Sequence, residues 1–263
     1  MKTYKIHFIE KESDITIISE SKEAILRAKK ELYFHRHILE KYIVKNKTFL
    51  TTFSPIKVNT KHLIINRMAQ AASLCNVGPM ATVAGALADL MMISMKNKED
   101  LNYNPAKIAL VENGGEIAVD SIKPMKVGLY AGKNELNLNI GFLVEEKDIP
   151  IGISTSSATV GHAISFGEAD AVTIFADNAT IADGAATATC NLVKGSDVEK
   201  SIKKGLDHVE DIEGIGVRGA FISRNNMVGK VGKIPKLIKI EGNISKILND
   251  KLESIFSDNF KIL

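Results

Sequence analysis

Polar and apolar residues alternate with a period of two along several short stretches of the chain, a pattern typical of strands that bury one face. The alternation predicts a hairpin from residues 4–9 and 14–18, and a second hairpin across 109–119, where Gly114 and Gly115 separate two β-rich runs. Further strands are expected at 126–131, 136–144, 171–175, 216–223, 227–231 and 236–240.

Longer segments place apolar residues every three or four positions, as amphipathic helices do. This spacing predicts helices at 21–45, 61–75, 79–95, 196–209 and 244–255. Pro79 suits a first helical turn, and Ser196 is expected to cap the helix that follows it. Because strands and helices alternate irregularly and hairpins are frequent, the pattern favours an α+β fold with largely antiparallel sheets packed with helices.

The length of 263 residues allows a substantial buried core. We expect one domain over residues 1–263, with an N-terminal hairpin and long helix in 1–55, a core in 60–240 and a C-terminal helix in 241–263. Hydrophobic residues make up 45% of the chain and charged residues 25%, which is typical of a globular protein and excludes a disordered one.

The formal net charge of +3 is too small to indicate a nucleic-acid partner. No apolar run reaches the length of a membrane span, and the N-terminal residues show no apolar signal segment, so we expect neither a membrane partner nor export. Two cysteines, Cys75 and Cys190, form no disulfide framework. These features together predict a cytoplasmic protein, and a homo-oligomer is compatible with them.

The first candidate chemistry lies in residues 176–193, a segment rich in small residues that reads as a helix. Asp183 and Thr187 lie four positions apart and therefore on one helix face, about one turn from each other. Two such oxygens, with a phosphate and water, are a plausible half-site for Mg²⁺. The alternative is an Ala-rich core helix whose Asp lies near the helix start because the helix dipole favours it there.

Several motifs follow one another in a fixed order along the chain. They are Asn113-Gly114-Gly115 between two strands, the hydroxyl run Ser154-Thr155-Ser156-Ser157, the strand at 171–175, and the helix with Asp183 and Thr187. This order resembles the C-terminal half of the ApbE-like superfamily, and within it an uncharacterised branch of archaeal and anaerobic bacterial proteins. Gly85 and Asp89 fall where that superfamily has Gly-x-x-x-Asp on its flavin-side helix. The resemblance covers about residues 75–195.

ApbE proteins are Mg²⁺-dependent flavin transferases that split FAD and attach FMN to a threonine of a partner protein. The resemblance therefore implies an ApbE-like domain that binds Mg²⁺ and FAD or FMN, or another small phosphate-bearing ligand. It implies metal ligation by Asp183 and Thr187, with His162 as a candidate for acid or base work. The residues that it implies for cofactor binding are Gly85, Asp89, Asn113, Gly114, Gly115, Thr155 and Ser156.

Two departures from the superfamily pattern bear on the activity. Ala84 stands where flavin transferases carry Lys, and residues 161–167 replace their His-x-x-Asp-Pro segment, so that only His162 matches part of it. Two hypotheses therefore remain. One is a Mg²⁺-dependent enzyme that hydrolyses or transfers a phosphate-bearing group. The other is a non-catalytic binding or accessory protein, for instance in anaerobic thiol or sulfur metabolism, that keeps the fold without flavin transfer.

Simpler explanations exist for several of these motifs. The side-chain hydroxyls of residues 154–157 can form hydrogen bonds with nearby backbone groups in a turn, which needs no ligand. Turn geometry alone likewise accounts for Gly114 and Gly115. Residues 214–219 fit a Gly-x-Gly-x-x-Gly string, but they follow a helix and enter a strand, the reverse of a dinucleotide-binding unit. We expect His35 and His37 to lie on a helix surface rather than to share a metal.

Overall fold

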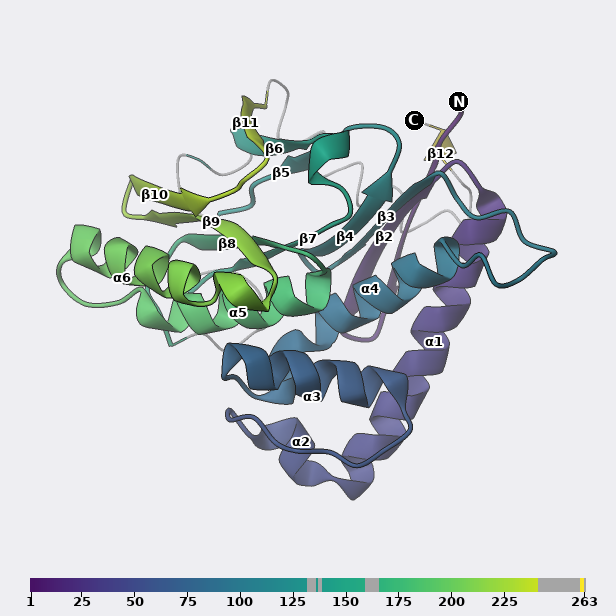
Figure 1. The fold of residues 1–263 in the computed structure, drawn as a ribbon, viewed down its shortest axis with the longest axis horizontal. Coiled ribbons are helices and arrows are strands. Elements are labelled where there is room, and N and C mark those ends of the chain that lie inside the picture. Colours follow the sequence, from purple (N-terminus) through teal and green to yellow (C-terminus); the bar gives the residue numbers. More distant parts are fainter. Residues whose placement is uncertain (132–135, 137–138, 159–165, 241–260, 263) are drawn as a thin grey trace.

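The computed structural model describes residues 1–131, 136, 139–158, 166–240 and 261–262, and the following account concerns these residues (Figure 1). The elements in chain order are β1 (Tyr4–Glu10), β2 (Ser13–Ser19), α1 (Lys22–Lys45), α2 (Lys47–Thr51), α3 (Leu63–Cys75), η1 (Pro79–Thr82), α4 (Val83–Met95), β3 (Ile108–Asn113), β4 (Glu116–Ser121), β5 (Met125–Gly128), β6 (Ile140–Val144), η2 (Glu146–Asp148), β7 (Ile151–Ser156), β8 (Ala171–Ala176), α5 (Ala179–Leu192), α6 (Val198–Asp211), η3 (Glu213–Ile215), β9 (Val217–Arg224), β10 (Met227–Gly232), β11 (Lys236–Lys239) and β12 (Lys261–Ile262). The η elements are 3₁₀ turns.

Two antiparallel sheets form the centre of the fold. The large sheet has the strand order β10-β9-β8-β7-β4-β3-β2-β1-β12, and the small sheet has the order β11-β6-β5. Every pairing in both sheets is antiparallel. The predicted α+β class with largely antiparallel sheets is therefore confirmed.

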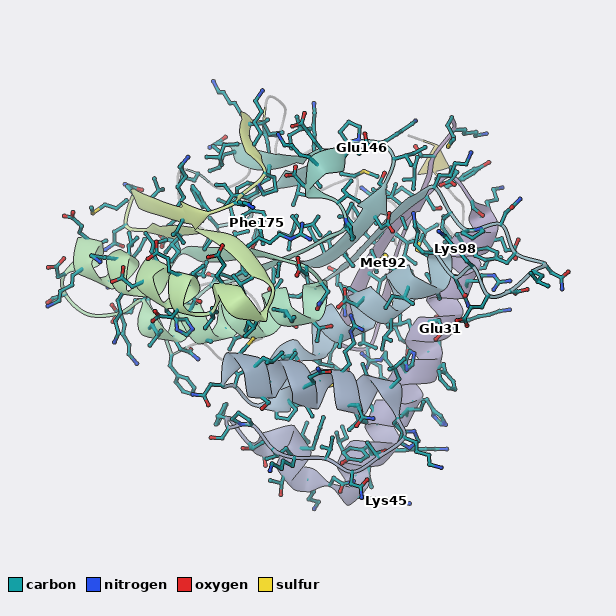
Figure 2. The ribbon with its side chains drawn as sticks, viewed as in Figure 1. Glu31, Lys45, Met92, Lys98, Glu146 and Phe175 are labelled. Atoms are coloured by element: carbon teal, nitrogen blue, oxygen red, sulfur yellow. The ribbon has the colours of Figure 1, made fainter. Side chains whose placement is uncertain are left out.

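Alternate residues of the large sheet enter two different cores, as the period of two requires. In β8, Val172 and Ile174 pack among the helices, whereas Phe175 packs on the opposite face against the small sheet. There the Phe175 ring meets Phe142 of β6 edge-on, with ring centroids 4.8 Å apart (Figure 2). Because β8 is covered on both faces, all six of its residues are buried.

Helices cover the other face of the large sheet in two layers. Figure 1 shows α1, α4, α5 and α6 next to the sheet, with α3 and α2 beneath them. Helix α1 packs on α4, and α5 packs on β7, β8 and α4. The sequence starts these helices with side-chain caps: Ser21 accepts a hydrogen bond from the Ala24 amide, and Asn178 accepts one from the Ile181 amide.

Several expectations need correction. Asp197, not Ser196, caps α6, because its carboxylate accepts from the Lys200 amide. The segment 79–95 is a 3₁₀ turn followed by α4 rather than one helix, and the short helix α2 was not predicted. Of the expected C-terminal helix in 241–263, only residues 261–262 are described, and they form a strand beside β1. His35 is buried rather than on the surface, with its Nε2 3.1 Å from Glu31, while His37 is exposed as expected.

Among the described helices, no single one combines the length and apolar character of a membrane span. The bent pair Leu63–Cys75 and Pro79–Met95 meets both criteria only when joined across a 100° break.

Candidate functional site

Where helices α4 and α5 cross, a carboxylate from each helix binds backbone amides at the start of the other helix. The Asp183 carboxylate of α5 accepts a hydrogen bond from the Gly85 amide in the first turn of α4, at 2.9 Å. In return, the Asp89 carboxylate of α4 accepts from the amides of Ala179 and Thr180, the first residues of α5, each at 2.9 Å. Each carboxylate thus occupies the electropositive start of the other helix, where unpaired amides and the helix dipole favour an anion.

Asp89 is fully engaged inside the protein. It is 1% exposed, and besides the two α5 amides it binds the Thr180 hydroxyl and, at 2.9 Å, the Arg67 guanidinium. The cofactor contact implied for Asp89 is therefore not what the geometry indicates. Asp89 instead fixes the start of α5, and through α5 the position of Asp183.

Gly85 lets the backbones of α4 and α5 approach closely at this crossing. A Cβ atom built at this position would lie 2.2 Å from the carbonyl oxygen of Ala179, closer than any real contact. The glycine therefore allows two helix backbones to touch, and only its amide, which binds Asp183, faces the candidate site.

The strands opposite this crossing present polar side chains on their helix-facing side. Gly152 of β7 lies against the backbone of Asn178 and Ala179, so Ser154 and Ser156 face the helices as well. The Ser154 hydroxyl lies 3.4 Å from the Glu116 carboxyl of β4.

Thr155 points the other way. Its hydroxyl is hydrogen-bonded to the Thr173 hydroxyl at 2.9 Å, and neighbouring residues of the same parity, Ile151 and Ile153, pack in the core beneath the small sheet. Thr155 therefore lies on the opposite face of the sheet from Asp183, and the cofactor contact implied for it stays a prediction.

Helix α5 and strand β7 run in the same direction from the contact of Gly152 with Ala179. Eight helical residues beyond Ala179 advance about 12 Å, and four strand residues beyond Gly152 advance about 13 Å. Thr187, which is half-buried, is thus level with Ser156. Asp183, Thr187 and Ser156 belong to one strip between α5 and the end of β7.

Two carboxyl groups in this strip, those of Glu116 and Asp183, interact unfavourably with each other. Burial, with a smaller contribution from the negative charge of Glu112, raises the pKa of Glu116 to about 7. Burial also raises the pKa of Asp183 well above its ordinary value, and the charges that raise it in addition are those of Glu116 and Asp89. Hydrogen bonds from the amides of Gly85 and Ala84 oppose this shift. A cation at this point would remove the repulsion.

The turn between β3 and β4 closes one end of the strip. Gly114 and Gly115 both have positive φ, +67° and +117°, which explains why glycine occupies them. The space around the Cα of Gly115 is open, because a Cβ there would meet no atom within 4 Å. Asn113, just before the turn, donates its side-chain amide to the Ala84 carbonyl at 3.2 Å, which ties the turn to α4.

A groove of about 500 Å³ opens on the other side of the first turn of α4. This volume falls in the range of small-molecule sites. Its apolar wall comes from α1, α2, η1 and α4 and consists of Leu39, Ile43, Leu50, Met80, Val83, Ala84 and Leu87. Its polar rim consists of Lys11, Glu12, Ser13, Arg36, Glu40 and Asn113. Ala84 lines the groove while the next amide, that of Gly85, binds Asp183, so the groove and the carboxyl pair lie back to back.

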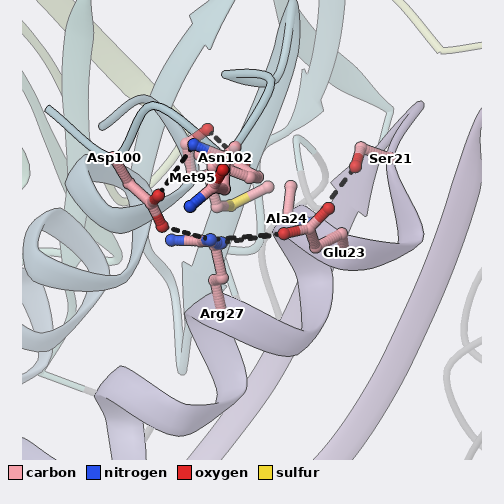
Figure 3. A network of polar contacts seen from close by, with 8 residues as sticks. Ser21, Glu23, Ala24, Arg27, Met95, Asp100 and Asn102 are labelled. Atoms are coloured by element: carbon pink, nitrogen blue, oxygen red, sulfur yellow. Dashed lines mark hydrogen bonds and ion pairs between the residues drawn. The ribbon is translucent and has the colours of Figure 1, made fainter. Parts of the chain in front are cut away.

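A second hollow, of about 390 Å³, lies between α1 and the end of α4. Its most prominent cation, Arg27, is already engaged. Arg27 lies 2.7 Å from Asp100 and 3.2 Å from Glu23 (Figure 3). Its guanidinium is also 3.8 Å from the ring centroid of Tyr103. These contacts hold the loop after α4 against α1, so we assign this hollow no ligand.

The structure thus brings Asp183 and Asn113 to the start of α4, where they bind the Gly85 amide and the Ala84 carbonyl. Thr187, Ser156, Gly114 and Gly115 stay predicted site residues. His162 lies outside the described residues and stays a prediction. Glu116 was missed as a site residue, although a carboxylate opening an otherwise apolar strand, Glu116 to Val119, was visible in the sequence. Within the described part of the chain, no three His, Cys, Asp or Glu side chains cluster as a metal site would require. A cation here would therefore depend on hydroxyl, phosphate and water oxygens as well.

Comparison with known proteins agrees with this architecture. A family model described as AbpE bacteria matches residues 1–218. The UPF0280 protein of Methanocaldococcus jannaschii is 40% identical over 245 residues, covering 92% of this chain and 96% of its own. The UPF0280 protein of Methanococcus vannielii is 42% identical over 234 residues, covering 88% and 91%.

Two solved structures share the fold at low sequence identity. The Pseudomonas stutzeri flavinyl transferase ApbE in its apo form has a TM-score of 0.53 at 13% identity, with coverage of 89% of this chain and 96% of that one. The flavin transferase ApbE from Vibrio cholerae has a TM-score of 0.52 at 11% identity, with coverage of 88% and 97%.

Proposed function

This chain belongs to the AbpE bacteria family, and we propose that it binds a ligand with a flat ring and a phosphate group, such as a flavin nucleotide, together with Mg²⁺. The observation that carries the proposal is the pair formed by the half-buried Glu116 and the buried Asp183 beside the start of α4, where the strongest charges acting on Asp183 are negative. Folding two carboxyl groups together costs free energy that a bound cation would recover.

The donors in the strip fit Mg²⁺. Asp183, Glu116 and the hydroxyls of Thr187 and Ser156 supply only oxygen, which Mg²⁺ prefers over nitrogen or sulfur. Asp183 and Thr187 would hold the cation. When bound, Mg²⁺ would polarise a phosphoryl oxygen and neutralise charge that develops on a phosphoanhydride. The amides of the first turn of α4 offer a further favourable environment for a phosphate.

The groove beside Ala84 fits the ring of such a ligand. Its wall is apolar and its rim polar, as in sites that bury a flat heterocycle and leave its polar edge accessible. A ligand that lay in the groove with its phosphate at the carboxyl pair would pass around the start of α4, beside the hydrogen bond between Asn113 and Ala84. The solved neighbours are named flavin transferases, and this name supports a flavin as the first ligand to test.

The reaction class that follows is hydrolysis or transfer at a phosphoanhydride. A second candidate is a binding or accessory protein, and one observation favours it. The groove presents the methyl group of Ala84 at the position where flavin transferases carry Lys, so it offers no cation at that point. Product analysis separates the two: an enzyme consumes FAD only when Mg²⁺ is present, whereas an accessory protein binds the flavin and releases it unchanged.

The test is a titration of FMN and FAD in the presence of Mg²⁺, followed by the change in flavin fluorescence. In Val83→Trp the larger side chain fills the groove, and we expect the affinity for flavin to fall at least tenfold. Leu26→Trp is the matched control, because Leu26 lines the second hollow and its substitution should leave affinity unchanged. The proposal fails if the wild type binds neither flavin, or if both variants bind as well as the wild type.

A further inference from the structure

The turn between β1 and β2 is bonded to α1 along the rim of the groove. Both elements line the groove, the turn with Lys11, Glu12 and Ser13 and the helix with Arg36 and Glu40 among others. The Lys11 ammonium lies 2.7 Å from the Glu40 carboxylate. The Arg36 guanidinium donates to the Glu12 carboxylate and to the Ser13 hydroxyl, each at 2.6 Å. These contacts join two separate walls of the groove at its rim.

The strand that follows the turn is fixed, so only the tip of the hairpin has room to move. Ile15 is fully buried in the core beneath the helices, and the Gly114 amide donates to the Asp14 carbonyl at 2.9 Å. The side chains of Lys11 and Glu12, in contrast, are 53% and 85% exposed. These two residues therefore form a tip that extends beyond the packed part of the hairpin.

Two features oppose the contact between this tip and α1. Lys11 has a φ of +52°, in the left-handed region that favours glycine, so its backbone is strained. The Nε of Arg36 is buried and has no hydrogen-bond partner among the described residues, although both terminal nitrogens of the guanidinium have one. The ion pairs that oppose opening are weak, because Lys11, Glu12 and Glu40 are exposed to water and salt. Weak bonds across a strained turn are typical of an element that opens locally.

We propose that the tip formed by Lys11 and Glu12 is a strap across the mouth of the groove, which releases α1 to admit a ligand and closes over the ligand afterwards. Opening breaks the pairs of Lys11 with Glu40 and of Glu12 with Arg36, while the bond to the Asp14 carbonyl stays in place. Loops that close over a bound ligand exclude water and slow its release. The strap rests on the proposed function only for the identity of the ligand, because opening of the groove can be measured without one.

A thiol in the groove reports how often the strap opens. Ala84 lines the groove, and Cys75 and Cys190 are 2% and 0% exposed, so Ala84→Cys gives the folded protein one accessible thiol. The probe is dipyridyl disulfide, an uncharged aromatic reagent whose reaction with a thiol is followed by absorbance. The added double substitution Glu12→Gln and Glu40→Gln neutralises both carboxylates of the strap and keeps their volume. We expect it to speed labelling at least about fivefold.

Salt provides a second, independent perturbation of the strap. About 0.5 M NaCl screens exposed ion pairs, so it should speed labelling when the strap is intact and have little effect in the double variant. The comparison of low and high salt needs no substitution in the strap, and it decides the question should the double variant fold poorly. Asp207→Asn is the control, because it removes the exposed ion pair with Lys203 on α6 and should leave labelling unchanged.

The strap is refuted if the double substitution or salt leaves the labelling rate of Ala84→Cys unchanged, or if Asp207→Asn raises that rate equally. The association of FMN, followed by stopped-flow fluorescence, separates this result from the proposed function. Labelling that responds as expected without flavin binding refutes the flavin assignment alone. Flavin binding with a labelling rate that does not depend on the strap refutes the strap alone.

Discussion

Asp89 and Asp183 are both buried aspartates at the α4–α5 crossing, yet their removal should have opposite effects on stability. We expect Asp89→Asn to destabilise the protein strongly and Asp183→Asn to leave its stability unchanged or raised. The reason lies in their partners. Asp89 is surrounded by hydrogen-bond donors and the Arg67 guanidinium, whereas Asp183 has negative neighbours that raise its pKa.

The magnitude follows from counting donors. Asp89 accepts from the amides of Ala179 and Thr180, from the Thr180 hydroxyl and from Arg67. An asparagine can satisfy some of these donors with its single oxygen, but its NH₂ group faces the others. Each buried donor left without an acceptor costs about 1–3 kcal/mol, so two such donors give a loss of about 2–6 kcal/mol. For Asp183→Asn the remaining oxygen can still accept from Gly85, while the cost of a buried charge disappears.

Thermal unfolding followed by circular dichroism at pH 7.5 is the assay. For a domain of this size about 1 kcal/mol corresponds to a change of about 2–4 °C in Tm, so we expect Asp89→Asn to lower Tm by at least about 5 °C. Asp207→Asn is the control, because Asp207 is an exposed partner of Lys203 on α6 and its loss should cost about 0.5 kcal/mol or less. Equal losses for Asp89→Asn and Asp183→Asn, or a harmless Asp89→Asn, would refute the reciprocal arrangement of the two helices.

Further predictions concern Glu116, Gly85 and the thiols. The pKa of Glu116 is raised from 4.5 to about 7, so the stability it contributes is present below pH 4.5 and lost as the pH rises through 7; Glu116→Gln should flatten this fall in urea titrations at several pH values. Gly85→Ala should cost about 1–3 kcal/mol by forcing α4 from α5, whereas Gly214→Ala, with open space around it, should change the unfolding midpoint little. Cys75 and Cys190 are 2% and 0% exposed, and burial raises the pKa of Cys75 to about 12, so an aromatic disulfide reagent should react with neither thiol until the protein unfolds; rapid labelling of the native protein would contradict their burial.

The strands and the large helices could be predicted from the sequence because the hydrophobic residues of each recur with a single spacing. Alternation located β2, β3 and β8, whose two faces enter different cores, and a spacing of three to four located α1. Helix α2 was missed because five residues are too short to show a period. His35 was placed wrongly because its Glu31 partner lies on the same helix and the polar pair resembles a solvated surface.

The candidate site was predictable in its residue types but not in their roles. Asp183 was expected either to bind metal or to favour the start of its own helix. The structure has its carboxylate at the start of α4, a contact between residues far apart in the chain, and its metal ligation stays a prediction. Gly85 and Asp89 matched a ligand-binding motif, yet their local geometry is explained by helix packing. The sequence did not show which hydroxyls of the run 154–157 share a face with Asp183; in the structure Thr155 faces the other way, as alternate residues of a strand do.

The most direct test of the proposed site is a calorimetric titration of Mg²⁺, with and without FAD, on the wild type and on Asp183→Asn. The substitution removes a charge and little volume, and circular dichroism verifies that the variant is folded. We predict that the wild type binds Mg²⁺ more tightly when FAD is present and that Asp183→Asn lowers this affinity at least tenfold. Equal affinities for the two proteins, or negligible binding by both, would contradict a cation site at Asp183 and Thr187.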